Sequence, residues 1–536
     1  MGNREQEIGN REQAAGRDSF TPHPAGLDKI LILDFGSQYT QLIARKIREL
    51  SVYCEIHPFN VSMEFIKNFG AKAIILSGGP SSVYQEGSPS VSKEIFELDL
   101  PILGICYGMQ LICQLFGGKV QKSAKKEFGQ HSMDVLQECL LLSDIKNPAI
   151  VLMSHGDCIV DIPTDYVKTA QSENTPYCAM RHCEKPFYGV QFHPEVVHTI
   201  EGSQILSNFL FKIAKVEPNW SMENFIKFKT EEIKKTVGND NVVLGLSGGV
   251  DSSVAAVLIH KAIGKQLKCI FVNNGVLRLN EGQKVQDLFK GYYNIDLIYV
   301  DATDEFLAEL KGVENPEKKR KIIGHKFIEV FDREAKKIGG VKFLGQGTLY
   351  PDVIESVSFK GPSDVIKSHH NVGGLPEKMD LKLLEPFREL FKDEVREIGR
   401  KLNMPDEIIN RQPFPGPGLA VRILGDITKE RIEILQKADD IVVGEIKNAG
   451  LYTKLWQSFA VLLPIKTVGV MGDERTYESV CAVRAVTSQD AMTADWAKIP
   501  YEVLERISSR IINEVRGINR VVYDISSKPP STIEWE

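Results

Sequence analysis

The sequence has 536 residues, 43% of them hydrophobic and 25% charged, and these ordinary globular proportions exclude collagen-like, coiled-coil and disordered chains. The formal net charge of −6 gives no overall electrostatic reason for binding nucleic acid, and no apolar run approaches the roughly 20 residues of a membrane span, so we expect neither nucleic acid nor membrane as a partner. The length requires several domains, because single cores stop growing near about 250–300 residues. Nine cysteines without a CxxC pair favour a reduced, cytoplasmic protein over a disulfide framework or a zinc knuckle.

The first 27 residues differ from the rest of the chain in composition. They contain the sequence GNREQ twice and lack the apolar core of a signal peptide. We expect residues 1–27 to form a disordered tail.

Apolar strand-like runs alternate with helix-like stretches from residue 29 onward. Strands are predicted at 29–34, 71–77, 101–105 and 187–192, a helix at 38–50 and a closing helix at 203–215. This alternation is typical of a parallel sheet with helices on both faces. Proline and asparagine in 216–220 (VEPNW) interrupt the pattern and predict a linker, so a first domain is expected at 28–219.

A second block repeats the alternation and a third departs from it. Strands are predicted at 242–246, 268–272, 297–300 and 342–344, which indicates another doubly wound domain at 220–411. Residues 411–418 (RQPFPGPG) are too rich in proline and glycine for regular structure, and helices then mix with strand-like runs such as 466–471. The predicted fold class is α/β, with two doubly wound parallel-sheet domains followed by an α+β domain at 412–536.

Cys106 lies in 101–111 (PILGICYGMQL), where an apolar strand runs into a helix-like stretch. Gly104 and Gly108 flank it by two positions, and glycines so placed allow a strained strand-to-helix turn that exposes a nucleophile. The positive end of the following helix favours a thiolate. A buried cysteine in a strand-helix corner explains the isolated motif about equally well.

Residues 188–195 (YGVQFHPE) and 76–80 (LSGGP) supply the other parts of a nucleophilic site. His193 and Glu195 are two positions apart, so on a strand they face the same way and the carboxylate can orient the imidazole. We assign the oxyanion hole to the backbone N–H groups of Gly79 and Tyr107.

Five segments together resemble the class I glutamine amidotransferases over about 190 residues: DFGSQY, LSGGP, GICYGMQ, SHGD and YGVQFHPE. The resemblance implies that Cys106 attacks the carboxamide of glutamine, that His193 shuttles the proton and that Glu195 orients His193. A glutamyl thioester then forms, ammonia leaves, and water releases glutamate. It further implies that Gln110 and the SHGD segment (154–157) hold glutamine. Cys113, further along the same helix-like stretch, is expected to be a core residue.

The second block opens with a glycine-rich turn between a strand at 242–246 and an apolar helix. Its backbone amides and the helix N-terminus suit a phosphate group. A Walker P-loop is excluded because its lysine is missing, and Asp251 is suited to a Mg²⁺ ion bound to pyrophosphate. The ATP-binding candidates are Ser247, Gly248, Gly249, Val250, Asp251, Ser252 and Ser253.

This SGGVDSS turn resembles the loop of the ATP pyrophosphatases, which adenylate a substrate oxygen. The loop alone leaves NAD, asparagine and argininosuccinate synthesis and tRNA thiolation open. Residues 271–281, 316–324, 344–356 and 367–376 are similar to the GMP synthetase family, although Asn273 stands where the family often has aspartate. A metal at His369 and His370 is not expected, because Lys367 adjoins them and no third ligand has suitable spacing; the resemblance places them in a lid over ATP. Lys392 and Asp393 are candidates for residues beside that lid, and solvated helix charges explain them equally well.

The C-terminal residues 527–536 (SKPPSTIEWE) combine prolines with apolar side chains, which predicts a packed tail. With 411–418 and 488–496 (SQDAMTADW) they extend the resemblance to the GMP synthetase family over residues 29–536. That family uses glutamine, ATP and XMP, forms an adenyl-XMP intermediate and dimerises through this domain. The implied XMP-binding residues are Arg320, Pro413, Gly416, Gly418, Lys528, Thr532, Ile533 and Glu534.

Two alternatives remain open from the sequence. One is another amidotransferase on the same modules, such as a glutamine-dependent NAD synthetase, which would need a different acceptor site. The other is an inactive regulator that binds glutamine and nucleotide. Loss of Cys106, His193, Glu195 or Asp251 would indicate the regulator, and all four are present.

Overall fold

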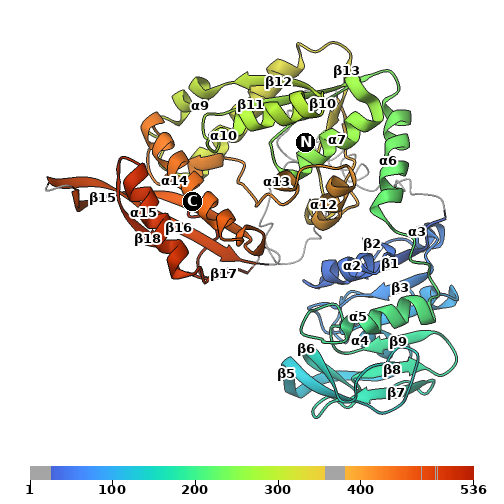
Figure 1. Ribbon diagram of the computed structural model, residues 1–536. Helices are drawn as coiled ribbons and strands as arrows, with labels where there is room; N and C mark the ends of the chain where they lie inside the picture. Colours follow the sequence, from blue (N-terminus) through green and yellow to red (C-terminus); the bar gives the residue numbers. More distant parts are fainter. Residues whose placement is uncertain (1–25, 357–380, 472–473, 489–490, 492) are drawn as a thin grey trace, which may run out of the picture. The chain divides into compact units, whose positions relative to one another are not determined.

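The structure is a computed structural model that describes residues 26–356, 381–471, 474–488, 491 and 493–536. The chain divides into two compact units, Met1–Phe225 and Ile226–Glu536 (Figure 1). The predicted tail at 1–27 lies almost entirely outside the described residues, as do His369 and His370. Within the described ranges, no helix combines the length and the apolar character needed to cross a bilayer.

The first unit is built around a nine-stranded sheet with the order β2-β1-β3-β4-β9-β8-β7-β5-β6. The strands from β2 to β9 in this order are parallel, and the remaining strands pair antiparallel. The strands are β1 (Lys29–Asp34), β2 (Tyr53–Pro58), β3 (Ala73–Leu76), β4 (Ile102–Ile105), β5 (Lys119–Val135), β6 (Ala149–Asp161), β7 (Tyr166–Gln171), β8 (Ala179–His182) and β9 (Phe187–Val190).

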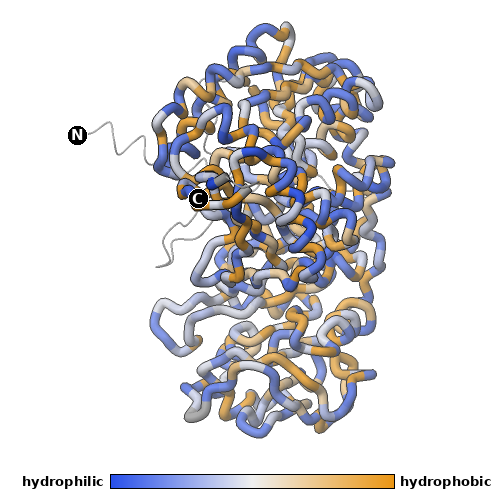
Figure 2. The backbone as a smooth tube through the Cα atoms, turned by 60° about the vertical axis from the view of Figure 1, so that its left-hand side comes forward, coloured by the Kyte–Doolittle hydropathy of each residue, from blue (hydrophilic) through white to orange (hydrophobic). Residues whose placement is uncertain are grey.

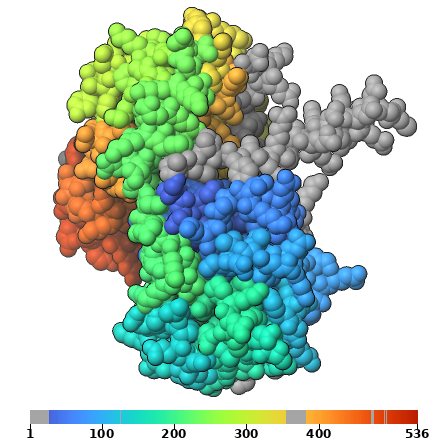
Figure 3. Space-filling model, turned by 90° about the vertical axis from the view of Figure 1, so that its right-hand side faces the viewer, coloured from blue at the N-terminus to red at the C-terminus, as the bar shows by residue number. Residues whose placement is uncertain are grey.

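Helices cover both faces of the parallel part of this sheet. Leu31 and Leu33 of β1 share a buried cluster with α3, η1 and α4, whereas α2 contacts α5. The space-filling view shows this unit, blue to blue-green, as one packed body (Figure 3). The helices are α2 (Thr40–Glu49), α3 (Met63–Phe69), η1 (Lys93–Glu97), α4 (Tyr107–Leu115), α5 (Gly202–Ser207) and η2 (Asn208–Ile213).

The predicted linker at 216–220 is fixed to the first unit. The Trp220 ring lies 4.8 Å from the ring of Tyr53 and 4.6 Å from the guanidinium carbon of Arg48, and the Trp220 backbone N–H donates to the carbonyl of Ser51 over 2.9 Å. A cation held over an aromatic face is attracted by the ring quadrupole. The division between the two compact units lies in the next helix, α6 (Met222–Val237).

The second unit begins with a five-stranded parallel sheet with the order β12-β11-β10-β13-β14. The chain moves from β10 to one side and later to the other, so β10 marks the point where ligands bind in doubly wound sheets. The strands are β10 (Asn241–Gly245), β11 (Leu267–Asn273), β12 (Asp296–Asp301), β13 (Val341–Gly345) and β14 (Lys382–Leu384).

Helical segments surround this sheet and connect it to the rest of the unit. Hydrophobic stretches alternate with hydrophilic ones along the tube in Figure 2, as the burial of one face of each element requires. The segments are α7 (Val250–Ile263), η3 (Gly264–Gln266), α8 (Glu281–Gln286), η4 (Asp287–Tyr292), α9 (Thr303–Leu310), α10 (Pro316–Ala335), α11 (Tyr350–Ser356), α12 (Lys392–Lys401) and α13 (Asp406–Ile409).

The C-terminal part pairs a long antiparallel hairpin, β15 with β16, and adds β17 and β18 to β16. One buried cluster contains Val243 and Leu344 from the parallel sheet together with Leu419 and Ile518, so both parts of this unit share a core. The elements are η5 (Gly418–Arg422), α14 (Lys429–Asn448), η6 (Tyr452–Lys454), β15 (Gln457–Met471), β16 (Glu474–Thr487), β17 (Asp495–Trp496), α15 (Tyr501–Glu514) and β18 (Ile518–Tyr523).

Candidate active sites

Cys106 forms a strained corner between β4 and α4. Its φ of 52° lies in the left-handed region, which is costly for a residue with a Cβ. A Cβ on Gly104 would lie 2.6 Å from the backbone of Gly108, and a Cβ on Gly108 would collide with the carbonyl oxygen of Leu76. Both glycines are therefore needed to bring the turn this close to β3.

His193 and Glu195 follow β9, which pairs with β4, so they meet Cys106 at the carboxyl edge of the sheet. His193 Nδ1 lies 2.7 Å from Glu195 Oε1, and the imidazole is hydrogen-bonded to Cys106. Since Nδ1 faces the carboxylate, Nε2 faces the sulfur. This is the arrangement that a nucleophile, its base and an orienting carboxylate require.

The environment of His193 favours its charged form. Burial is the largest influence and opposes the charge, but the Glu195 carboxylate and the hydrogen bonds to Cys106 and Glu195 outweigh it and hold the pKa of His193 well above its ordinary value. Both His193 and Glu195 are almost fully buried. An imidazolium is thus stabilised beside the sulfur.

Gly79 and Tyr107 lie next to each other beside Cys106. A Cβ on Gly79 would be 3.3 Å from Cγ of Tyr107 and 2.8 Å from the carbonyl oxygen of Phe35, so glycine is required for this approach. Tyr107 is the first residue of α4, and first-turn amides have no acceptor within their helix. The Gly79 backbone and the first residue of α4 thus lie close together beside Cys106.

Gln110 and the 154–157 segment also reach this site. Gln110 Nε2 donates to the Asp157 carbonyl over 3.2 Å and to Gln191 Oε1 over 3.1 Å. Gln191 was missed from the sequence. It lies with His193 and Glu195 beyond β9, which ends at Val190, so the strand alternation expected for 188–195 does not extend to these residues. Cys113 is fully buried, as expected, and burial raises the pKa of its thiol to about 12.

The glycine-rich turn of the second unit connects β10 to α7. Gly248 has a φ of 72°, and Gly249 precedes the first residue of α7. Ser247 and Ser252 link the two ends of the turn, with their Oγ atoms 2.8 Å apart. The turn thus directs backbone amides and a helix N-terminus at the edge of the sheet where β10 ends.

Asp251 lies in the first turn of α7 with one carboxylate oxygen partnered and one not. Lys392 Nζ lies 3.2 Å from Oδ2, so the lysine proposed beside a lid contacts the loop itself. Oδ1 is buried without a hydrogen-bond partner, and so is Oγ of Ser253. These oxygen donors fit Mg²⁺, which takes one or two protein oxygens together with phosphates and water. Among the described residues, no group of three His, Cys, Asp or Glu side chains could hold a metal alone.

Arg411 ties the predicted nucleotide-binding segment to the phosphate loop. It donates to the Gly248 carbonyl over 2.7 Å and pairs with Glu281. Its guanidinium lies 5.7 Å from the ring of Phe414, which also lies 4.9 Å from the guanidinium of Arg278 and 5.2 Å from that of Arg422. The sequence offered no signal for this long-range contact.

The C-terminal tail is packed against the 411–418 segment. Gln457 Nε2 donates to the Pro413 carbonyl over 2.8 Å and to Glu534 Oε1 over 3.0 Å. Arg422 binds both oxygens of Glu534 at 3.0 and 2.8 Å, and Ile533 is buried. Pro413 and Glu534 are thus brought together. Gly418 is also required, because a Cβ would collide with the Val276 carbonyl.

The remaining predicted XMP-binding residues occupy different surroundings. Lys528 Nζ donates to the Ala491 carbonyl over 2.8 Å, and Arg320 donates to the Glu536 backbone oxygen over 2.5 Å. Thr532 and Glu534 line an open pocket of about 340 Å³ with Asp524, Ser526, Ser531 and Trp535. A Cβ on Gly416 would meet nothing within 4 Å.

Comparison with known proteins matches three families along the chain. Residues 31–213 match class-I glutamine amidotransferases, residues 221–289 match NAD synthase, and residues 444–535 match the GMP synthase C terminal domain. The first unit is a class I glutamine amidotransferase. The second combines an ATP pyrophosphatase of the NAD synthase kind with a GMP synthase C-terminal domain.

Similar proteins extend over nearly the whole chain. The glutamine-hydrolyzing GMP synthase of Brachyspira hyodysenteriae is 66% identical over 510 residues, 95% of this chain and 99% of that protein. Those of Phenylobacterium zucineum and Aquifex aeolicus are each 58% identical with the same coverage. The chain belongs to the glutamine-hydrolysing GMP synthase family. It is a ligase that uses ATP and glutamine-derived ammonia to aminate XMP to GMP.

Proposed function

We propose that Cys106, His193 and Glu195 hydrolyse glutamine and that the 247–253 loop drives the adenylation of XMP. The observation that carries the first half is the contact of a strained cysteine with an imidazole that is itself paired to a buried carboxylate at 2.7 Å. The loop at the end of β10 supports the second half, because its amides and helix N-terminus suit a pyrophosphate.

In the first site the Cys106 sulfur attacks the carboxamide carbon of glutamine. The tetrahedral oxyanion accepts hydrogen bonds from the amides of Gly79 and Tyr107. His193 passes the thiol proton to the leaving nitrogen, so ammonia departs and a glutamyl thioester remains. Water, deprotonated by His193, then attacks the thioester, releases glutamate and restores the thiol. Gln110 and the 154–157 segment hold the glutamine.

In the second site the C2 oxygen of XMP attacks the α-phosphorus of ATP, and pyrophosphate leaves. The loop from Ser247 to Ser253 holds the β- and γ-phosphates through its amides. Ammonia then adds at C2 and AMP departs, which gives GMP. Adenylation is needed because AMP is a far better leaving group than oxide.

Asp251 is proposed to hold the Mg²⁺ ion of Mg-ATP. The buried, unpartnered Oδ1 supports this role, and the ion would neutralise charge on the departing pyrophosphate. Lys392, which pairs with Oδ2, would remain close enough to contribute a second positive charge.

XMP is proposed to bind between the 413–418 segment and the C-terminal tail. The hydrogen bonds that join Pro413, Gln457 and Glu534 support this placement. Lys528 and Thr532 would bind the phosphate of XMP, and Ile533 and Glu534 would contact its base and sugar. Gly416, Gly418 and Arg320 would also line the XMP site. An NAD synthetase-like acceptor is not favoured, because the match to NAD synthase ends at residue 289 and the GMP synthase C terminal domain covers 444–535.

We further propose that the chain consists of a tail at 1–27 and domains at 28–219, 220–411 and 412–536. We also propose that it forms a homodimer through the domain at 412–536. The β15–β16 hairpin supports dimerisation, since it projects as a ribbon (Figure 1). Val468 is paired with Tyr477 across the hairpin, and Val468, Val470 and Tyr477 are 57%, 74% and 66% exposed. Residues two apart face the same side, so the three form one apolar stripe.

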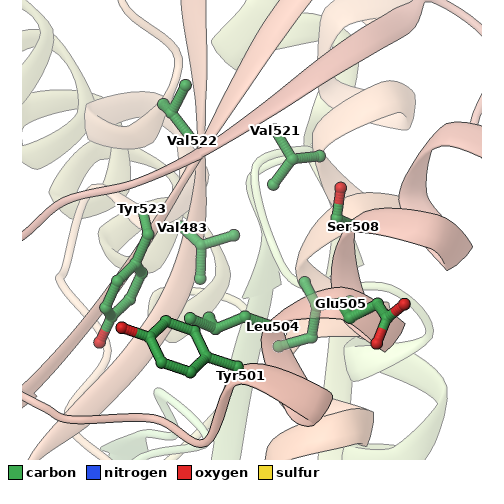
Figure 4. Close-up of a pocket in the computed structure, with 9 residues that line it drawn as sticks. Val483, Tyr501, Leu504, Glu505, Ser508, Val521, Val522 and Tyr523 are labelled. Atoms are coloured by element: carbon green, nitrogen blue, oxygen red, sulfur yellow. The ribbon is translucent and has the colours of Figure 1, made fainter.

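An apolar groove of about 300 Å³ lies on the same part of the unit. Figure 4 shows Tyr501 and Leu504 of α15 beside Val483 and Val521 of the sheet. Tyr501 is 86% exposed. Exposed apolar surface of this kind marks protein contacts, and a second copy of the chain is the proposed occupant.

A cytoplasmic location is also proposed, since all nine cysteines are free thiols.

The separation of the two sites is tested with Cys106→Ala. The variant should lose GMP formation driven by glutamine and keep GMP formation driven by ammonium salts. Loss of both activities in a folded variant would show that the two reactions are not separable in this way.

A further inference from the structure

The Cys106 sulfur has a second hydrogen-bond donor besides His193. Gln191 Nε2 lies 3.6 Å from Sγ, within the range for sulfur acceptors. Gln191 is fully buried directly after β9, and its backbone N–H donates to the Cys178 carbonyl over 2.8 Å. The side chain is therefore held against the reacting atom from a fixed backbone position.

The orientation of the Gln191 amide is determined by a chain of hydrogen bonds. The two ends of a glutamine amide look alike, so their assignment depends on the partners. The Asp157 carbonyl can only accept, which requires Gln110 to present its NH₂ group there, at 3.2 Å. The same Nε2 lies 3.1 Å from Gln191 Oε1. Since the oxygen of Gln191 faces Gln110, its NH₂ group must face Cys106.

The far end of this chain is also fixed. His155 Nδ1 lies 3.0 Å from the same Asp157 carbonyl, and because that carbonyl only accepts, the nitrogen must carry the proton. Its Nε2 lies 3.5 Å from Oε2 of Glu127. Both His155 and Glu127 are buried. The Asp157 carbonyl thus accepts from two buried side chains, Gln110 and His155, and buried hydrogen-bond networks of this kind are rigid.

We propose that Gln191 is a further catalytic residue of the glutaminase site, donating a hydrogen bond to the Cys106 sulfur. The inference rests on the proposed role of Cys106 as nucleophile. The N–H stabilises the thiolate before it attacks the carboxamide. It acts again when the tetrahedral intermediate of thioester hydrolysis collapses: the carbon–sulfur bond breaks, its electron pair stays on sulfur, and glutamate leaves. In the thioester itself the sulfur is neutral, so the hydrogen bond favours the states with charge on sulfur.

The test is the rate at which iodoacetamide alkylates Cys106, followed by mass spectrometry of the peptide that contains it. Gln191→Met preserves the length of the side chain and removes the donor, and Gln191→Glu places a carboxylate beside the sulfur. A hydrogen bond to a charged group is worth roughly a factor of 10 to 100. Alkylation at neutral pH should fall about tenfold in Gln191→Met and further in Gln191→Glu, and its pH profile should move to higher pH.

The matched control is Gln204→Met. Gln204 is an exposed residue of α5, and its side-chain amide donates to Asn208 Oδ1 over 3.0 Å. The control variant should alkylate at the rate of the unmodified protein. An unchanged rate and pH profile in a folded Gln191→Met would overturn the proposal. If that variant does not fold, Gln110→Met provides the second measurement, since it frees the Gln191 amide to turn and should slow alkylation several-fold. An unchanged Gln110→Met rate would then count against the proposal.

Two results distinguish an error in the role of Cys106 from an error in the role of Gln191. If Cys106→Ala retained glutamine-driven activity, Cys106 would not be the nucleophile and the role of Gln191 would have no basis. If Cys106→Ala is inactive with glutamine while Gln191→Met alkylates normally, only the role of Gln191 is wrong.

Discussion

Lys392 Nζ lies 3.2 Å from Oδ2 of Asp251 across 141 residues of sequence. The pair joins the start of α12 to the first turn of α7, within the phosphate loop. Lys392 is partly exposed, whereas the other oxygen of Asp251 is buried without a partner. The carboxylate is therefore held at the loop from one side and remains available to a cation on the other.

Asp251→Asn should abolish pyrophosphate release. The amide keeps the shape of the side chain but loses the charge that a Mg²⁺ ion requires, so release from Mg-ATP with XMP should fall at least about a hundredfold. Glutamate formation in the first site needs no such group. The control is Asp304→Asn, since Asp304 is an exposed aspartate paired with Lys429. Undiminished release by Asp251→Asn would exclude the magnesium role.

The phosphate loop was predicted from the sequence, and the Asp251–Lys392 contact was not. Strand, glycines and helix follow one another within residues 241–263, so local pattern is sufficient. Lys392 could equally have been a solvated helix charge. The Cys106 turn is likewise a local feature, and its two glycines predicted it. The hydrogen bond from Arg411 to Gly248 spans 163 residues and was not predicted. Such contacts depend on how distant elements pack.

The antiparallel strands of the first unit were also missed. β5 spans Lys119–Val135 and is largely polar, with the sequence KVQKSAKKEFGQHSMDV. It lacks the continuous apolar run of β4, all four residues of which are buried. A strand with polar, exposed positions resembles a loop in composition, so its place in the sheet follows from pairing with β6 and β7.

Glu195→Gln should lower the pH at which glutamine hydrolysis is lost on the alkaline side of its pH profile. Burial lowers the pKa of His193, and the carboxylate reverses that effect. Without the charge, burial dominates and the imidazolium is lost at lower pH. The high-pH limb of the glutaminase rate should move to lower pH, and the rate should fall by roughly 10² to 10⁴.

The matched control for this change is Glu184→Gln, which alters an exposed carboxylate of the same unit. The Glu184→Gln variant should have the same pH profile of glutamine hydrolysis as the unmodified protein. A Glu195→Gln profile that coincides with that of the unmodified protein would mean that Glu195 does not support the charge on His193.

Glu534→Ala should weaken both XMP binding and the fold of the second unit. Arg422 is fully buried and its guanidinium binds both oxygens of Glu534. Without Glu534 the buried Arg422 guanidinium keeps only the more distant carboxylate of Asp439, at 3.9 Å, and breaking a buried pair costs up to about 3–5 kcal/mol. The KM for XMP should rise and the unfolding temperature should fall. Glu502→Ala, an exposed glutamate of α15, is the control. A KM for XMP equal to that of the unmodified protein would show that Glu534 does not take part in XMP binding.

Val470→Glu should shift the protein toward monomers. A charge in the stripe formed by Val468, Val470 and Tyr477 opposes burial against a second copy, since an unpaired charge is costly to desolvate. Sedimentation velocity measures the change. Tyr292→Glu, at a site 69% exposed and away from the hairpin, should have no effect. A protein that is monomeric before substitution, or a Val470→Glu dimer as tight as the original, would contradict the proposed interface.

The central claim is that glutamine hydrolysis in one unit serves the amination of XMP in the other. It is tested most directly by measuring pyrophosphate release from Mg-ATP by the purified protein with glutamine and XMP, beside reactions with deamido-NAD or with no acceptor. The account predicts release only with XMP, accompanied by GMP, AMP and glutamate in equal amounts. Release with deamido-NAD and none with XMP would preserve the chemistry of the two sites and contradict the assigned acceptor.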